Sequence, residues 1–242
     1  NSAGRNEYAD ALARLRTTYG EYVPYATARD LFVELAYYGP DLLRFADEFK
    51  DLVEKQEGMK EDELKEASDK RLVAAKAHFA AHDVDVDKRV LKALLPIYRS
   101  RVPAHLLPAA FKEIDARFNG DANAWVDALY ARSMLTDEAR FNKAFGKGNP
   151  KAWKKLSKDP GYKFARSVFS TFLDQVRPAH AQLSDRIEND MRLYVRGMME
   201  LYPDKTYWPD ANSTLRLSYG KVEGSAPRDA VSYIHYTTLD GV

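Results

Sequence analysis

Two histidines on a predicted helix are the first candidates for chemistry in this sequence. In His78-Phe79-Ala80-Ala81-His82 the two imidazoles stand at positions i and i+4, which places them on one helix face. Zinc proteases use this spacing with a glutamate directly after the first histidine, because that base activates the metal-bound water. Here the position holds Phe79. A hydrolytic zinc site is therefore not expected; a half-exposed helix face is the preferred interpretation, and a structural metal pair is the alternative.

Three alternating aspartates follow this pair. Asp83, Asp85 and Asp87 are spaced as at the start of a calcium loop, which also needs glycine at its sixth position and glutamate at its twelfth. Those positions hold Lys88 and Leu94. We therefore expect the aspartates to act at the start of the next helix, with Asp85 or Asp87 as its cap.

Other catalytic motifs are missing from the sequence. There is no G-x-S-x-G turn for a serine nucleophile, and residues 146–148 (GKG) are too short for a phosphate loop. The cysteine count is zero, which excludes disulfides, thiolate zinc sites and a cysteine nucleophile. The tryptophans are expected in the core. The residues alone thus assign no catalytic residue, no metal ligand and no cofactor.

Composition narrows the class of protein. The 242 residues are 45% hydrophobic and 30% charged, which is typical of a globular protein. Lys and Arg number 37 against 36 Asp and Glu, so the basic excess of a nucleic-acid binder is missing. No apolar run is long enough to span a membrane. The first six residues lack the apolar region of a signal peptide, and the missing initiator Met suggests a processed, truncated or excised chain.

Apolar residues repeat with helical spacing from residue 5 to about residue 200. A first stripe steps by four and three through Tyr8, Leu12, Leu15, Tyr19 and Tyr22. A second runs through Leu31, Leu35, Tyr38, Leu42, Phe45, Phe49 and Leu52. Gly39-Pro40 lies inside the second stripe without shifting its phase, which predicts a kink or tight break between two helices.

The remaining helices are shorter, except for the last. We expect a polar helix at 61–76, short helices at 108–118, 121–132, 136–144 and 150–157, and a longer one at 162–177. Pro178 can begin the final helix, whose stripe is Leu183, Ile187, Met191, Tyr194, Met198 and Leu201. Such stripes favour antiparallel packing of long helices.

The pattern changes after Pro203. Leu215, Leu217 and Tyr219 alternate with polar residues as in a strand, and residues 233–238 form a second β-prone stretch. Two short strands do not make a stable sheet alone, so they are expected either to pair with strands that this chain does not contain or to lie against the helical body. The sequence thus predicts a mainly α fold, an antiparallel helical domain at 1–202, and a linker with strands at 203–242.

The C-terminal stretch also carries a family resemblance. Residues 207–222 (YWPDANSTLRLSYGKV) closely resemble a segment of bacterial dipeptidyl-peptidases of serine peptidase family forty-six. The stretches 227–231 (PRDAV), 236–242 (YTTLDGV) and 87–108, which begins DKRV, are similar to the same family. Trp208 and Ser225 depart from its pattern.

The resemblance implies an enzyme that removes dipeptides from the N-termini of peptides. Its trypsin-like double β-barrel carries a Ser/His/Asp triad, and a helical domain inserted in the barrel caps the active-site cleft. This chain resembles most of that insert plus the segment returning to the barrel. The family's His and Asp lie upstream of such a segment, and its Ser lies downstream, so no catalytic or substrate-binding residue is carried over.

Two hypotheses follow for the function. The first is the cap domain of a periplasmic or secreted dipeptidyl-peptidase, inactive by itself, with peptide substrates and the barrel domain as partners and a homodimer left open. The second is a free-standing helical scaffold that binds another protein. Neither involves nucleic acid, a membrane or a cofactor.

Overall fold

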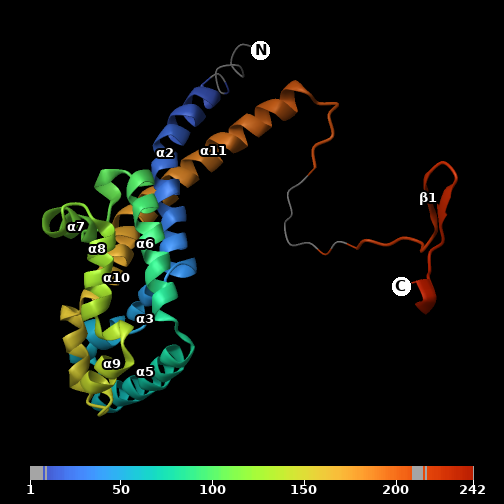
Figure 1. Ribbon diagram of the computed structural model, residues 1–242. Helices are drawn as coiled ribbons and strands as arrows, with labels where there is room; N and C mark the ends of the chain where they lie inside the picture. The colour runs from blue at the N-terminus through green and yellow to red at the C-terminus, as the bar shows by residue number, and fades with distance from the viewer. Residues whose placement is uncertain (1–7, 9, 209–214, 216, 242) are drawn as a thin grey trace. The chain divides into compact units, whose positions relative to one another are not determined.

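Helices dominate the structure, a computed structural model that describes residues 8, 10–208, 215 and 217–241. The chain divides into two compact units, one ending at Met198 and the other covering Met199–Val242 (Figure 1). The α-helices are α2 (Ala11–Val33), α3 (Asp41–Asp47), α4 (Lys50–Glu54), α5 (Glu61–Ala81), α6 (Val84–Arg101), α7 (Ala110–Phe118), α8 (Ala122–Arg132), α9 (Glu138–Phe145), α10 (Pro160–Thr171) and α11 (Arg177–Leu201).

Tighter and wider helical turns connect these elements. The π-helical segments are η1 (Glu34–Tyr38) and η6 (Phe172–Val176), and the 3₁₀ segments are η2 (Gln56–Gly58), η3 (Ala104–Leu106), η4 (Met134–Thr136), η5 (Pro150–Lys158) and η7 (Leu239–Gly241). The mainly α prediction is therefore confirmed. The four predicted short helices are present within two residues of their expected bounds, the last of them as the 3₁₀ segment η5.

The long helices α2 and α11 run antiparallel to each other, as expected (Figure 1). The predicted stripe of α2 is only partly buried: Leu15 is buried, but Leu12 and Tyr19 are 62% and 44% exposed, and Ala11 and Thr18 are buried in their place. Three polar contacts join the two helices: Arg14–Asp190 at 2.8 Å, Arg186–Glu21 at 2.9 Å, and Tyr22–His180 at 2.9 Å. Tyr22 of the predicted stripe therefore faces α11.

The Gly39-Pro40 break separates η1 from α3. Pro40 is extended with ψ 139°, and α3 begins at the next residue. A side chain at Gly39 would lie 2.7 Å from the Glu34 carbonyl oxygen and 2.8 Å from Leu94. Only glycine therefore fits this approach of the chain to α6. The stripe beyond the break is buried as predicted, at Leu42, Phe45, Phe49 and Leu52.

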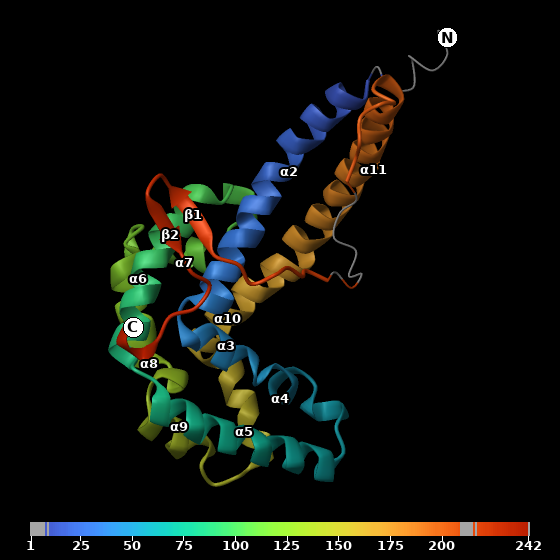
Figure 2. The same ribbon diagram turned by 90° about the vertical axis from the view of Figure 1, so that its right-hand side faces the viewer.

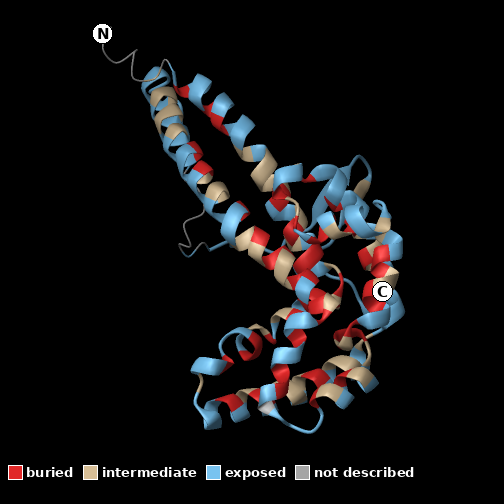
Figure 3. Cartoon of the chain, turned by 90° about the vertical axis from the view of Figure 1, so that its left-hand side faces the viewer, coloured by how far each residue is buried: buried red, intermediate tan, exposed pale blue. Residues whose placement is uncertain are grey.

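An aromatic cluster forms the core at the end of the helical unit that carries α5 and α9. The indole of Trp153 is 1% exposed, and its Nε1–H donates a hydrogen bond to the Ser68 hydroxyl at 2.8 Å. Its ring stacks on Phe145 and on Phe49, with centroids 4.6 and 5.2 Å away. Trp125 is buried too, as expected, whereas Trp208 is 86% exposed. Figure 3 shows buried and exposed residues alternating around most of the helices.

Helix α10 packs mainly against α3 and begins at a buried carboxylate. Asp159, only 2% exposed, accepts hydrogen bonds from the Ser133 hydroxyl at 2.7 Å and the Met134 amide at 2.6 Å. It also caps α10 by accepting from the Tyr162 amide at 3.1 Å. The cap thus fixes the start of α10 against the loop after α8.

The chain passes from α10 to α11 without a break. We expected Pro178 to begin a new helix, but α11 starts at Arg177, whose backbone stays helical at φ −59° and ψ −47°. The π-helical segment η6 lies directly before it. Proline has no backbone N–H, so one helical hydrogen bond is missing here, and the wider π-helical turn lets the helix continue without it.

The C-terminal unit contains a single hairpin among its described residues. Strand β1 (Ser225–Arg228) pairs antiparallel with β2 (Val231–Tyr233), as Figure 2 shows. The predicted strand around Leu215, Leu217 and Tyr219 is wrong for the residues that the structure describes; residues 209–214 and 216 lie outside them. The second β-prone stretch also begins too late, since only Tyr233 belongs to a strand. The strands that pair across the turn at 229–230 are thus not the predicted ones, and a partner for the stretch around Leu217 stays a prediction.

Two glycines give a matched test of this packing. A Cβ at Gly161 would lie 2.6 Å from the Ser133 hydroxyl and 3.2 Å from Leu42, so Gly161→Ala should lower the free energy of unfolding by roughly 1–3 kcal/mol. Gly20 is exposed inside α2 with nothing within 4 Å, so Gly20→Ala should raise it by about 0.5–1 kcal/mol. Urea unfolding of both variants measures the difference. Equal effects would contradict the close packing at Gly161.

Candidate functional site

A buried polar cluster lies where α3 begins and α5 passes into α6. Asp41 is the first residue of α3, His82 caps the C-terminus of α5, and Asp87 lies in the first turns of α6. Tyr130 reaches the cluster from α8. The break before α3 and the short α5–α6 turn both bring polar groups to the same place.

Asp87 is the most buried member of the cluster. Its side chain is 4% exposed, and it accepts the Asp41 backbone N–H at 2.5 Å and the Tyr130 hydroxyl at 2.7 Å. Burial raises the pKa of Asp87, although both hydrogen bonds act in the opposite direction. The pKa of the Tyr130 hydroxyl is raised as well, by its own burial and then by the neighbouring carboxylate. Asp87 thus serves α3 and α8 rather than its own helix.

The cap of α6 is Asp83, so the prediction of Asp85 or Asp87 is wrong. The Asp83 side chain accepts the amides of Asp85 and Val86, both at 3.0 Å. Asp83 lies two residues before Asp85, at the position whose backbone is still extended, and an N-cap requires that conformation. The three aspartates therefore do not converge on one cation.

The two histidines are packed together. The His82 side chain is only 5% exposed, so the half-exposed face expected for the pair is wrong at this residue. Its ring stacks on His78 with centroids 4.6 Å apart, and His78 stacks on Phe45 at 3.8 Å. Burial, and then the His82 ring, lower the pKa of His78 to about 4, so His78 is neutral at pH 7.

Carboxylates lie on both sides of the His82 ring. Nδ1 is 3.8 Å from Oδ2 of Asp41, and Nε2 is 3.8 Å from Oδ2 of Asp87. His82 Nδ1 and His78 Nε2 are buried without a hydrogen-bond partner. Asp41, His82 and Asp87 can each offer one ligand atom, and these atoms lie within 4.8 Å of one another. Sequence spacing revealed the two histidines but not Asp41 or Tyr130, which no local motif connects to them.

No triad is assembled in the part of the chain that the structure describes. No serine hydroxyl there is hydrogen bonded to a histidine; the serines bond to backbone carbonyls, to backbone amides, to Asp159 or to Trp153. His180 is paired with Tyr22 instead. This part of the chain therefore builds a packed helical scaffold with one buried polar cluster.

Comparison with known proteins identifies the relatives of this scaffold. The model of the Peptidase S46 family matches residues 1–242. The chain belongs to this family. The resemblance found in the C-terminal stretch is thereby confirmed and extends over the whole chain.

Curated relatives agree with the assignment. The Asp/Glu-specific dipeptidyl-peptidase of Flavobacterium psychrophilum is 32% identical over 242 residues, which are 99% of this chain and 33% of that protein. Dipeptidyl-peptidase 7 of Phocaeicola vulgatus is 36% identical over 218 residues, 90% of this chain and 29% of that protein. The chain spans about a third of the length of these relatives.

A solved structure has the same fold. The crystal structure of Porphyromonas endodontalis DPP11 matches with a TM-score of 0.70 at 23% identity, over 97% of this chain and 33% of that chain. The mainly α architecture of the chain is thus the architecture of one part of a larger S46 protein.

Two tyrosines test the role of the buried carboxylate in the stability of this S46 scaffold. Tyr130→Phe removes a donor from buried Asp87 and should lower the free energy of unfolding by roughly 1–3 kcal/mol. Tyr98 is equally buried, but its hydroxyl has no hydrogen bond among the described residues, so Tyr98→Phe should change stability by less than about 0.5 kcal/mol. Chemical denaturation measures both variants. A loss at Tyr98 as large as that at Tyr130 would contradict the assignment.

Proposed function

We propose that this chain is the helical cap domain of a serine-type dipeptidyl-peptidase that removes N-terminal dipeptides from peptides. The observation that carries the proposal is the S46 match over residues 1–242, combined with a length about a third of that of its relatives. Relatives from two organisms are named dipeptidyl-peptidases. We therefore assign dipeptidyl-peptidase activity to the longer parent protein of which this chain would be a part.

The cap role follows from what the helical unit offers. It has a continuous apolar core, and its described residues assemble no nucleophile with a base. A domain of this kind assists catalysis by covering a cleft, excluding water and keeping bulky substrates out. The Ser/His/Asp triad is assigned to a β-barrel domain outside these residues, and the segment after Leu201 is assigned to the return of the chain to that barrel.

The partners follow from the same assignment. They are peptide substrates, bound through the parent enzyme, and the barrel domain; a homodimer remains a further option. We place the parent enzyme in the periplasm or outside the cell, on the basis of the family resemblance. Among the described residues, no helix combines the length and apolar character needed to cross a membrane.

Activity assays test the division of labour. The 242-residue chain should fold to a helical protein and hydrolyse no dipeptidyl chromogenic substrate, whereas the full-length parent should hydrolyse it and lose activity to a serine-directed reagent. The reason is that the described residues assemble no triad. Turnover by the isolated chain that the same reagent blocks would overturn the proposal.

The cap role has its own readout in the parent enzyme. The parent should cleave a short chromogenic substrate but not a folded protein that begins with the same dipeptide. Replacing residues 11–201 with a short linker should reduce the ratio of kcat/KM for the short substrate to kcat/KM for the folded protein, provided that the short substrate is still cleaved. An unchanged ratio of the two kcat/KM values would contradict a role in restricting access.

The exposed side chains before the hairpin give a further prediction. Leu215, Leu217 and Tyr219 are 101%, 83% and 92% exposed in this chain. Leu217→Asp should therefore leave the melting temperature of the isolated chain unchanged, and should lower that of the full-length protein by several degrees, if the segment is buried against the barrel. Thermal melts of both forms provide the comparison. Equal shifts in the two forms would contradict the return of this segment to a barrel.

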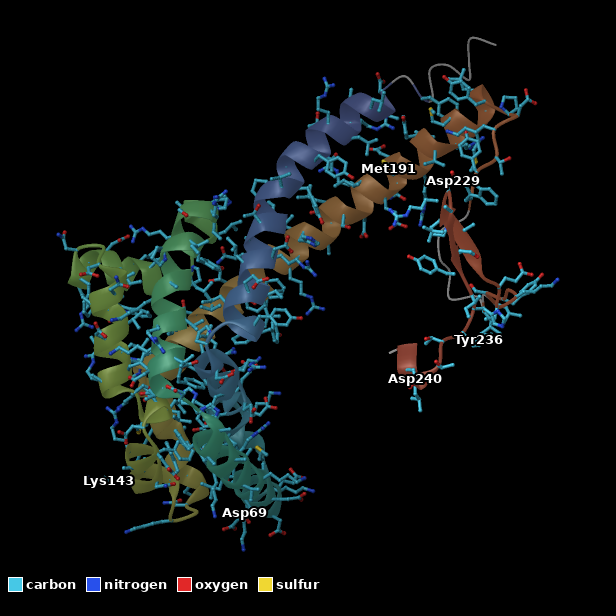
Figure 4. All side chains as sticks on the ribbon, turned by 45° about the vertical axis from the view of Figure 1, so that its right-hand side comes forward. Asp69, Lys143, Met191, Asp229, Tyr236 and Asp240 are labelled. Carbon is cyan, nitrogen blue, oxygen red and sulfur yellow. The ribbon has the colours of Figure 1, made fainter. Side chains whose placement is uncertain are left out.

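A scaffold that binds another protein is the second candidate function. The observation in its favour is the C-terminal half of α11, where Met191, Val195, Met199 and Leu201 are 37–66% exposed; Figure 4 shows Met191 on this helix. The gene distinguishes the two functions. A reading frame that ends near Val242 favours the scaffold, and one that continues into a segment with the family's catalytic serine favours the peptidase.

A further inference from the structure

The His82 side chain has an unused ligand atom in a buried position. Its Nδ1 lies within a side chain that is only 5% exposed, and it has no hydrogen-bond partner. Leaving such an atom unpaired is unfavourable, because on folding it loses its hydrogen bond to water and gains no partner in the protein. The atom faces Oδ2 of Asp41 at 3.8 Å, a separation too long for a hydrogen bond.

That separation is close to the one between two ligands of one ion. Nitrogen and oxygen ligands bind zinc at about 2.0–2.2 Å, so two of them on a tetrahedral ion lie roughly 3.3–3.6 Å apart, a few tenths of an ångström less than the separation found here. Oδ2 of Asp41 is available for this role, since the Arg44 guanidinium pairs with Oδ1 of the same carboxylate. We propose that a divalent transition-metal ion, with Zn²⁺ as the best fit, binds between His82 and Asp41 and joins the start of α3 to the α5–α6 turn.

Asp87 supports this site from the opposite side of the ring. The second nitrogen of His82, Nε2, faces Oδ2 of Asp87 at 3.8 Å. Metal-binding histidines commonly have a carboxylate beside their other ring nitrogen. At 3.8 Å the Asp87 carboxylate accepts no hydrogen bond from the ring and acts on it through its charge. Asp87 is held in place by the Tyr130 hydroxyl and the Asp41 amide. The cluster therefore contains both the ligands and a supporting carboxylate.

The donor set points to the class of ion. An imidazole and a carboxylate suit Zn²⁺ or Mn²⁺ better than Ca²⁺, which takes oxygen ligands alone. The Asp41 side chain is 47% exposed, so the site has a route for the ion and room for water ligands. The site differs from the His78/His82 pair considered from the sequence, because the second ligand comes from α3 and not from the same helix.

Zinc titration of the 242-residue chain tests the site. After treatment with a chelator, the chain is titrated with ZnCl₂ and should bind one Zn²⁺ per molecule, measured by isothermal titration calorimetry and by metal analysis after dialysis. Its melting temperature should rise when Zn²⁺ is bound. Asp41→Asn, which keeps the shape of a half-exposed side chain, should weaken zinc binding at least tenfold. His82→Ala should do the same. His105→Ala, at an exposed histidine in η3, should bind like the parent chain.

Three results would overturn the assignment. The first is no saturable binding, which would leave His82 as a buried ring between two carboxylates. The second is unchanged binding by Asp41→Asn, and the third is equal loss in His105→Ala. Loss in His78→Phe with full binding in Asp41→Asn would place the ion on the helical pair instead. The test is independent of the proposed peptidase function, since it needs neither substrate nor barrel.

Discussion

The carboxylate of Asp87 is the interaction on which the arrangement of the helical unit depends most. It stands in the first turns of α6, yet it bonds to the first amide of α3 and to Tyr130 of α8, 46 and 43 residues away in the chain. A negative charge at the N-terminus of α3 also interacts favourably with the helix dipole. These contacts offset the cost of burying the carboxylate. The hydrogen bond to Asp87 fixes the start of α3, and Phe45 of the same helix is buried in the aromatic core. A single side chain thus sets the positions of three helices.

Local periodicity predicted most of the helices, because the same residues decide both helix formation and burial in them. Leu42, Phe45, Phe49 and Leu52 are buried as their spacing indicated. In α2 the spacing was right for Leu15 but wrong for Leu12 and Tyr19, since the buried face depends on the approach of α11. That face includes Ala11 and Thr18. Apolar spacing shows that a helix has a packed side, but the partner helix decides which side it is.

The polar cluster shows a different limit. The spacing of His78 and His82 was visible in the sequence, and so was the possibility of a metal pair. Asp41 joins the cluster through the Gly39-Pro40 break, which the sequence predicted. Tyr130 joins it through the packing of α8 against α6, which no local pattern encodes. The preference for Asp85 or Asp87 as a cap failed for a related reason: Asp87 has a tertiary role that no local propensity includes. Function, in turn, was indicated by a family resemblance and not by any catalytic motif.

The C-terminal unit differs from the helical unit, because its large apolar side chains are mostly exposed among the described residues. Leu215 and Tyr219 alternate with polar residues as in a strand that is buried on one face, yet both are almost fully exposed. Exposed apolar side chains contribute nothing to stability by burial. The helical unit, by contrast, covers its own aromatic core. Under the proposed function, the alternating segment would be buried against the barrel of the parent enzyme. That assignment agrees with a chain that belongs to the S46 family and spans about a third of the length of its relatives.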